Sequence, residues 1–148
     1  MSFHIIDDEP AVREILDAFI SHDGYETLCF DSAEAYLEHF SSPEYVPPIA
    51  ILTDYMMPGM KGYALVKHIR QRAPYQKIAI VSGTADADHE ANTELCYMLH
   101  KPFTRDDILS FIHAMAACED ACIAGVRCYA HSMCEFGLKH PCPFAPSV

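Results

Sequence analysis

The sequence predicts an α/β fold, in which a doubly wound, five-stranded parallel sheet carries five helices and is followed by a short extension. Short apolar runs rich in β-branched residues alternate with longer segments whose apolar residues recur at helical spacing. The short runs are apolar almost throughout, which is typical of parallel strands that are covered on both faces. Turn residues and prolines separate the two kinds of segment.

Five short segments are expected to be strands, and all but the second are built around an apolar run. In chain order they are 3–6, 25–30, 49–53, 77–81 and 96–100. The turn at Asp23-Gly24 leads into the second strand. A stretch with three prolines, 41–48, forms the loop before the third strand.

Five segments are expected to be helices. The first begins at Pro10, where the missing N–H of proline is no loss. Either Asp31 or Ser32 caps the second, which continues to residue 40. The remaining three are predicted at 62–73, 86–95 and 104–117.

Five such strand–helix units match the flavodoxin-like strand order 2-1-3-4-5. In this order the first and third strands are neighbours. Residues that follow the carboxyl ends of the strands then meet in one crevice, at the edge where ligands bind in folds of this kind.

Polar residues stand at or near the ends of four of these strands. Asp7 and Asp8 follow the first strand, Asp54 the third, Ser82 the fourth and Lys101 the fifth. Three carboxylates in one crevice repel each other unless a divalent cation lies among them, so the sequence predicts a metal site.

Each motif alone has a simpler structural interpretation. Asp7 and Asp8 could cap the first helix by placing negative charge at its N-terminus. Asp54, followed by Met-Met-Pro-Gly, could begin an ordinary turn. The order of all the motifs along the chain is what these interpretations do not supply.

The motifs resemble those of the receiver domain of two-component response regulators. They are IIDDEP at 5–10, DYMMPGM at 54–60, VSG at 81–83 and KPF at 101–103, and the resemblance covers roughly residues 1–117. It implies that Asp54 is the phosphoacceptor, that Asp8 binds Mg²⁺ directly and that Asp7 binds it mainly through water. Asp54 and the backbone carbonyl of Met56 complete the implied set of ligands.

The resemblance also implies which residues contact the phosphoryl group and which proteins donate it and bind the modified domain. Lys101 and Ser82 would contact phosphoryl oxygens, and the Lys101-Pro102 peptide would be cis. A histidine kinase or phosphotransfer protein would donate the phosphoryl group, and a downstream protein target, not identified by the sequence, would read the modified surface. Such a module is not an enzyme in the ordinary sense, since its turnover is self-catalysed hydrolysis. The fourth helix, fifth strand and fifth helix would carry the change, and a homodimer could form through the fourth and fifth helices or the extension.

One position and one spacing depart from this family. Met98 stands three residues before Lys101, where most relatives carry an aromatic ring that turns inward. Tyr97 is one residue away and would face the other side of the strand. Met98 either acts as a softer switch or simply fills the core. The interval between Ser82 and Lys101 is also short for the family, which predicts a shortened fourth helix.

The composition narrows the class of partner and the expected location. The chain has 148 residues and a formal net charge of −11, with no cluster of Lys and Arg, which argues against binding nucleic acid. No signal peptide and no apolar run long enough to span a membrane is apparent. We therefore expect a cytoplasmic protein without a membrane partner, whose cysteines are reduced or metal-bound.

The cysteines mark the segment 118–148 as a separate, cysteine-rich extension of the domain at 1–117. Five of the seven lie there: Cys118, Cys122, Cys128, Cys134 and Cys142. They could bind zinc or an iron–sulfur cluster, pack as small hydrophobes along a helix that runs on to about residue 124, or form reversible disulfides. The alternative function is a metal (zinc or iron–sulfur) or redox sensor built on a receiver scaffold, with the C-terminal cysteines as its input.

Overall fold

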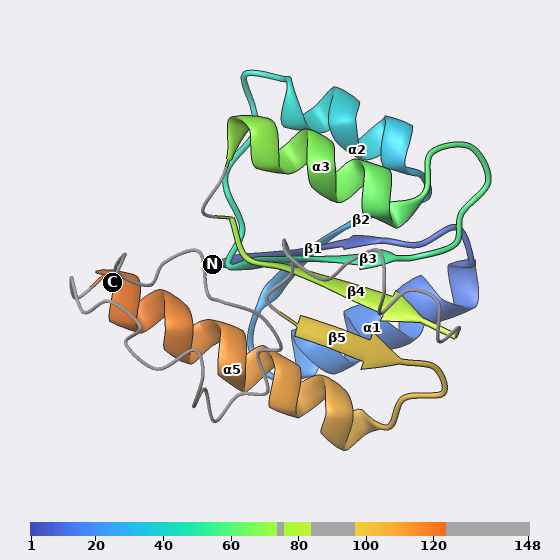
Figure 1. Cartoon of the computed structure of the whole chain (residues 1–148). Coiled ribbons are helices and arrows are strands. Elements are labelled where there is room, and N and C mark those ends of the chain that lie inside the picture. The colour runs from blue at the N-terminus through green and yellow to red at the C-terminus, as the bar shows by residue number, and fades with distance from the viewer. Residues whose placement is uncertain (74–75, 84–96, 124–148) are drawn as a thin grey trace, which may run out of the picture.

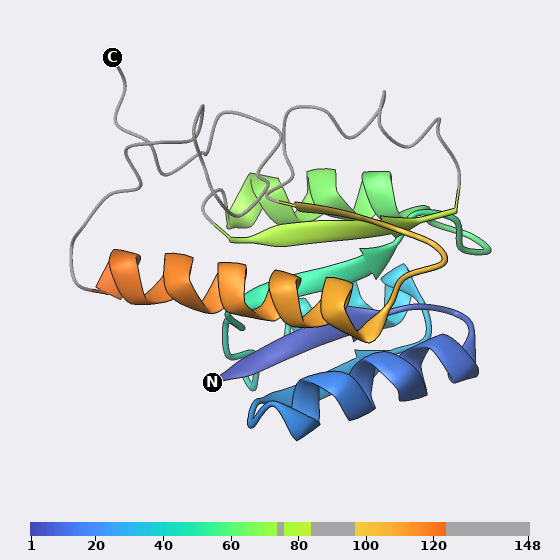
Figure 2. The ribbon, with the colours of Figure 1, turned by 90° about the horizontal axis from the view of Figure 1, so that it is seen from below.

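The protein is a three-layer α/β structure, in which helices cover both faces of a parallel sheet (Figure 1). The computed structural model describes residues 1–73, 76–83 and 97–123. Helices α2 (Ala33–Phe40) and α3 (Gly62–Arg72) lie on one face of the sheet. Figure 2 shows α1 (Pro10–His22) and α5 (Arg105–Ile123) together on the other face.

The sheet has the predicted order, β2-β1-β3-β4-β5, with all neighbouring strands parallel. The strands are β1 (Ser2–Ile6), β2 (Glu26–Phe30), β3 (Ala50–Asp54), β4 (Ile78–Ser82) and β5 (Tyr97–His100). Strands β3 and β4 are buried along their whole length, as the apolar runs predict. The register pairs Ile6 with Thr53, Asp54 with Val81 and Ser82 with His100. The carboxyl ends of these strands therefore meet at one edge of the sheet.

The helix signals are confirmed where the structure describes them. Pro10 opens α1, and Ser32 rather than Asp31 caps α2, since its hydroxyl accepts a hydrogen bond from the Ala35 N–H at 3.1 Å. Ala73 follows the last residue of α3. The predicted fourth helix, 86–95, lies outside the described residues.

Helix α5 runs past residue 117 and reaches Ile123, which agrees with the predicted continuation to about residue 124. The proposed division at 117/118 thus falls inside a helix, and it stays a prediction, as do the roles of the extension in metal binding and dimerisation. Within the described ranges, no helix combines the length and apolar character needed to cross a membrane.

Two apolar clusters, one on each face of the sheet, hold these layers together. On the α1/α5 face Phe3 packs edge-on against Tyr25 and Phe111, with ring centroids 5.3 and 5.9 Å apart. On the α2/α3 face Met98 is buried in the same cluster as Ile80 and Tyr36. In this structure Met98 therefore fills the core.

One histidine lies inside the α2/α3 face. The His4 side chain is 1% exposed, and its Nδ1 lies 2.9 Å from the Tyr36 hydroxyl. The Tyr36 hydroxyl in turn lies 3.3 Å from that of Tyr45. Burial and the charge of His39, whose ring centroid is 6.0 Å away, lower the pKa of His4 to about 4. His4 is therefore a neutral core residue at physiological pH.

Candidate functional site

The sheet edge described above carries the predicted site residues. Asp7 directly follows β1, Asp54 ends β3, Ser82 ends β4 and Lys101 directly follows β5. Backbone hydrogen bonds hold this edge together: the Asp7 N–H donates to the Phe30 carbonyl at 3.1 Å, and the Lys101 N–H donates to the Ser82 carbonyl at 2.7 Å. The strand ends are therefore fixed relative to one another.

Four carboxylates gather at this edge. Asp7, Asp8, Glu9 and Asp54 each offer one oxygen, and the four oxygens lie within 4.8 Å of one another. The Asp7 and Asp54 side chains are buried, at 1% and 5% exposed, whereas that of Glu9 is 62% exposed. The cluster thus has a buried floor and an exposed rim.

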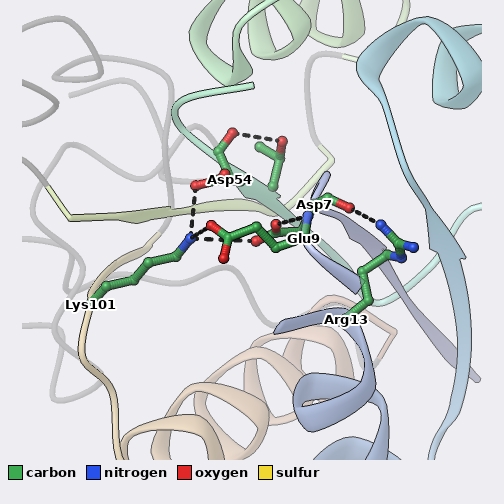
Figure 3. A network of polar contacts seen from close by, with 6 residues as sticks. Asp7, Glu9, Arg13, Asp54 and Lys101 are labelled. Carbon is green, nitrogen blue, oxygen red and sulfur yellow. Dashed lines mark hydrogen bonds and ion pairs between the residues drawn. The ribbon is translucent and has the colours of Figure 1, made fainter. Parts of the chain in front are cut away.

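Lys101 supplies the positive charge in the middle of these carboxylates. Its Nζ lies 3.3 Å from Asp54 Oδ1, 3.6 Å from Asp7 Oδ2 and 3.7 Å from Glu9 Oε1. Figure 3 shows the lysine side chain reaching across from β5 to this group. The ammonium therefore donates a hydrogen bond to Asp54 and makes longer ion pairs with Asp7 and Glu9.

The local electrostatics follow from burial and like charge. Burial and the charge of Asp7 raise the pKa of Asp54 to about 6, although Lys101 acts in the opposite direction. Burial also raises the pKa of Asp7. Burial alone would lower the pKa of Lys101, but the carboxylates of Asp54 and Asp7 raise it overall. The site therefore holds more negative charge than its lysine neutralises.

The contacts of Asp7 test whether a cation fits. Asp7 Oδ1 accepts a hydrogen bond from the Glu9 N–H at 2.9 Å, but the buried Oδ2 has no hydrogen-bond partner. An Arg13 Nη1 donates to the Asp7 backbone carbonyl at 2.5 Å and fixes the turn. A buried oxygen without a hydrogen bond, within a set made only of oxygen donors, fits a hard divalent cation.

The same contacts bear on the capping interpretation of Asp7 and Asp8. The N-cap of α1 is Glu9, and no side chain makes a capping hydrogen bond there. The acidic pair belongs to the carboxylate cluster, and Asp7 also accepts a hydrogen bond from the N–H of the N-cap residue.

The loop after β3 is pressed against Asp54. A Cβ at Gly62 would lie 2.2 Å from the Asp54 backbone oxygen, so only glycine fits this approach. Gly59 has a positive φ of 77°, and the Glu34 carboxylate of α2 accepts a hydrogen bond from the Met60 N–H at 2.8 Å. These contacts fix the chain that follows Asp54. Within this loop the Met56 side chain is 50% exposed.

The structure brings together four of the residues predicted from the sequence, namely Asp7, Asp8, Asp54 and Lys101. Ser82 is buried at the end of β4, and the Lys101-Pro102 peptide is cis, as the resemblance implied. Sequence reasoning missed Glu9 and Arg13. The only available signal for Glu9 was its position directly after the acidic pair.

The proposed second metal site can be placed only in part. Cys118 and Cys122 lie in α5, and Cys118 is partly buried. The other three cysteines of the set, Cys128, Cys134 and Cys142, lie outside the described residues. A zinc or iron–sulfur site in the extension therefore stays a prediction.

Comparison with known proteins places this geometry in a family. Residues 3–113 match the model of the response regulator receiver domain. The chain is 30% identical over 130 residues to the response regulator Rre1 of Synechocystis, covering 82% of this chain and 54% of Rre1. It spans about half the length, or less, of several curated relatives that it matches.

Solved structures share the fold. A response regulator receiver domain protein from Clostridium thermocellum superposes with a TM-score of 0.73 at 22% identity, covering 82% of this chain and 98% of that one. The response regulator TrrA from Thermotoga maritima, solved in complex with Mg²⁺-BeF, superposes with a TM-score of 0.69 at 23% identity, covering 77% and 97%. The chain therefore belongs to the response regulator receiver domain family, whose members are phosphoacceptor signalling modules of two-component systems.

Proposed function

We propose that Asp54 accepts a phosphoryl group from a histidine kinase or phosphotransfer protein, and that the modified chain presents a changed surface to a protein target. One observation carries this proposal: the buried Asp54 carboxylate lies among other carboxylates with the Lys101 ammonium 3.3 Å from its Oδ1. This arrangement places a nucleophile and a charge-neutralising group at one point on the sheet edge.

The transfer is a substitution at phosphorus. An oxygen of the Asp54 carboxylate forms a bond to phosphorus, while the bond from phosphorus to the imidazole nitrogen of the donor breaks and the nitrogen keeps the electron pair. The carboxylate must be ionised to attack. With a pKa of about 6, Asp54 is mostly ionised above neutral pH.

Mg²⁺ is the cation that best suits this donor set. Asp7, Asp8, Asp54 and the backbone carbonyl of Met56 would hold it, with water completing the coordination. A bound Mg²⁺ would offset the negative charge of the phosphoryl oxygens and keep donor and acceptor in line. The buried Asp7 Oδ2, which has no hydrogen-bond partner, supports a ligand at this position.

Lys101 and Ser82 would recognise the modified state. The Lys101 ammonium lies 3.3 Å from Asp54 Oδ1, and it would form a charge-assisted hydrogen bond with a phosphoryl oxygen carried by this residue. The Ser82 hydroxyl would donate to another phosphoryl oxygen. The Lys101 N–H already donates a hydrogen bond to the Ser82 carbonyl. A displacement of either residue would therefore move the ends of both β4 and β5.

The output surface would be the face built from the segment after β4, β5 and α5. Movement at the end of β5 would reach α5 through residues 101–104, which join the two elements. Hydrolysis of the acyl phosphate in the same site would restore Asp54 and end the signal.

Incubation with acetyl phosphate and Mg²⁺, followed by intact-protein mass spectrometry, tests this function. We expect the mass of one phosphoryl group to be added to wild type, to be absent without divalent cation and to be lost in Asp54→Asn. Asp31→Asn is the matched control, because Asp31 is exposed and follows β2 at the same sheet edge. Uptake by Asp54→Asn, or no uptake by folded wild-type protein, would refute the proposal.

A further inference from the structure

Glu9 is a carboxylate of the site to which the resemblance gives no role. It lies between the acidic pair and Pro10, the first residue of α1. Its Oε1 is 3.7 Å from Lys101 Nζ, and one of its carboxylate oxygens is within 4.8 Å of those of Asp7, Asp8 and Asp54. The side chain is 62% exposed, so Glu9 stands on the rim of the cluster.

We propose that Glu9 is a positioning residue of this site: it holds the Lys101 ammonium at the rim and adds one oxygen donor for the cation. In doing so it strengthens cation binding and slows the entry of anionic phosphoryl donors. This inference rests on the proposed function, because the donor in question is the one that would modify Asp54.

The position of the ammonium supports this role. Lys101 Nζ lies at nearly equal distances from the oxygens of Asp54, Asp7 and Glu9, between 3.3 and 3.7 Å. Asp54 and Asp7 are buried, whereas the Glu9 carboxylate that also attracts the ammonium is exposed. Figure 3 shows the ion pairs of Lys101 with all three carboxylates. Without the Glu9 carboxylate, the ammonium is left to the two buried carboxylates, at the point where the phosphoryl group would arrive.

The backbone of Glu9 is anchored while its side chain is accessible. The Glu9 N–H donates to Asp7 Oδ1 at 2.9 Å, so the residue keeps its place beside the cluster. The exposed carboxylate can therefore contact either Lys101 or a cation without any change of fold.

Two consequences of opposite sign follow from the charge of Glu9. An anionic donor that approaches Asp54 must pass this rim, so removing one negative charge speeds phosphorylation when the cation is saturating. The same change removes an oxygen donor and one negative charge near the cation, so the cation binds more weakly. Each effect should be about two- to fivefold, the size typical of an exposed charge pair.

The test compares Glu9→Gln, Glu9→Asp and Glu14→Gln with wild type. Glu14 is an exposed carboxylate on α1 outside the cluster, so Glu14→Gln makes the same change of net charge. Isothermal calorimetry measures Mg²⁺ affinity, and mass spectrometry measures the rate of modification by acetyl phosphate at saturating Mg²⁺ and constant ionic strength.

We expect Glu9→Gln to bind Mg²⁺ two- to fivefold more weakly and to be modified two- to fivefold faster. Glu9→Asp should retain at least half of the wild-type affinity, and Glu14→Gln should match wild type in both measurements. General damage to the site lowers both quantities together and does not produce this split. Unchanged Mg²⁺ affinity in Glu9→Gln, or a rate that does not rise, overturns the inference.

The two proposals fail in distinguishable ways. If wild-type protein takes up no phosphoryl group, the proposed function fails and with it the part of the inference that concerns donor entry. If wild type is modified normally and Glu9→Gln behaves like wild type, only the role of Glu9 fails.

Discussion

Protonation of one buried ring, that of His4, should cost this protein stability in acid, while Asp54, whose pKa is raised to about 6, contributes with the opposite sign. The side chain is 1% exposed and shares the α2/α3 face with Tyr36, Tyr45 and His39. Burial and the nearby His39 lower the pKa of His4 from 6.5 to about 4. Protonation of the ring is therefore much less favourable in the folded protein than in the unfolded chain.

The sign and size of the effect follow from proton linkage. Between pH 6.5 and about 4 the unfolded chain binds this proton and the folded protein does not, so acidification favours unfolding. The contribution of His4 to stability is complete above pH 6.5, falls through this window and is lost below about pH 4. At about 1.4 kcal/mol per pH unit, the loss amounts to about 3 kcal/mol.

Urea unfolding followed by circular dichroism, repeated from about pH 7.5 to about pH 4, measures this loss as the difference between wild type and His4→Asn, in which the opposite contribution of Asp54 cancels. His4→Asn keeps a polar atom near Tyr36 but does not titrate, so its free energy of unfolding should fall less on acidification, by about 3 kcal/mol. His68→Gln, at an exposed site on α3, should keep the wild-type pH dependence. The same pH dependence in wild type and His4→Asn would refute this reasoning.

Three further predictions concern the acidic site. Asp54→Asn should stabilise the metal-free protein by about 1–3 kcal/mol above pH 6. The reason is that burial and Asp7 raise the pKa of Asp54 from 3.8 to about 6, so its ionised form destabilises the fold. Urea unfolding in a chelator measures this, and an equal or lower stability of the variant would contradict it. Gly62→Ala should destabilise the folded protein by about 1–3 kcal/mol, because the new Cβ would meet the Asp54 backbone oxygen. Gly83→Ala is the control, because its Cβ would make only an ordinary contact at 3.9 Å. Equal shifts of the melting temperature in the two variants would contradict the argument. Lys101→Met should raise the pKa of Asp54 above about 6, because the ammonium stabilises the ionised carboxylate; carboxyl ¹³C NMR measures it, and a lower pKa would contradict the geometry.

The sheet and its edge could be predicted because β1, β3 and β4 are buried strands with an apolar local signal, whereas the edge strand β2 is partly exposed. Strands buried on both faces are apolar runs, and the residues that end them meet at one edge whatever the loops do. Strand ends are harder to place from the sequence. The third strand, predicted at 49–53, is Ala50–Asp54, since the apolar pattern does not show where pairing begins.

The features that could not be predicted depend on contacts between distant segments or on the path of a turn. The sequence separates His4 from Tyr36 by 32 residues, and their contact follows from how α2 packs on β1. Arg13 and Glu9 join the site because the turn after β1 folds back on itself. The need for glycine at position 62 depends on a backbone approach that only the folded chain reveals.

The central claim is that Asp54 carries the phosphoryl group, and chemical trapping tests it most directly. Borohydride reduces an aspartyl phosphate to homoserine, so protein treated with acetyl phosphate and Mg²⁺ can be reduced, digested and sequenced by mass spectrometry. We predict homoserine at position 54 and at no other aspartate. Homoserine at Asp7, Asp8 or elsewhere, or none in folded protein, would contradict the account.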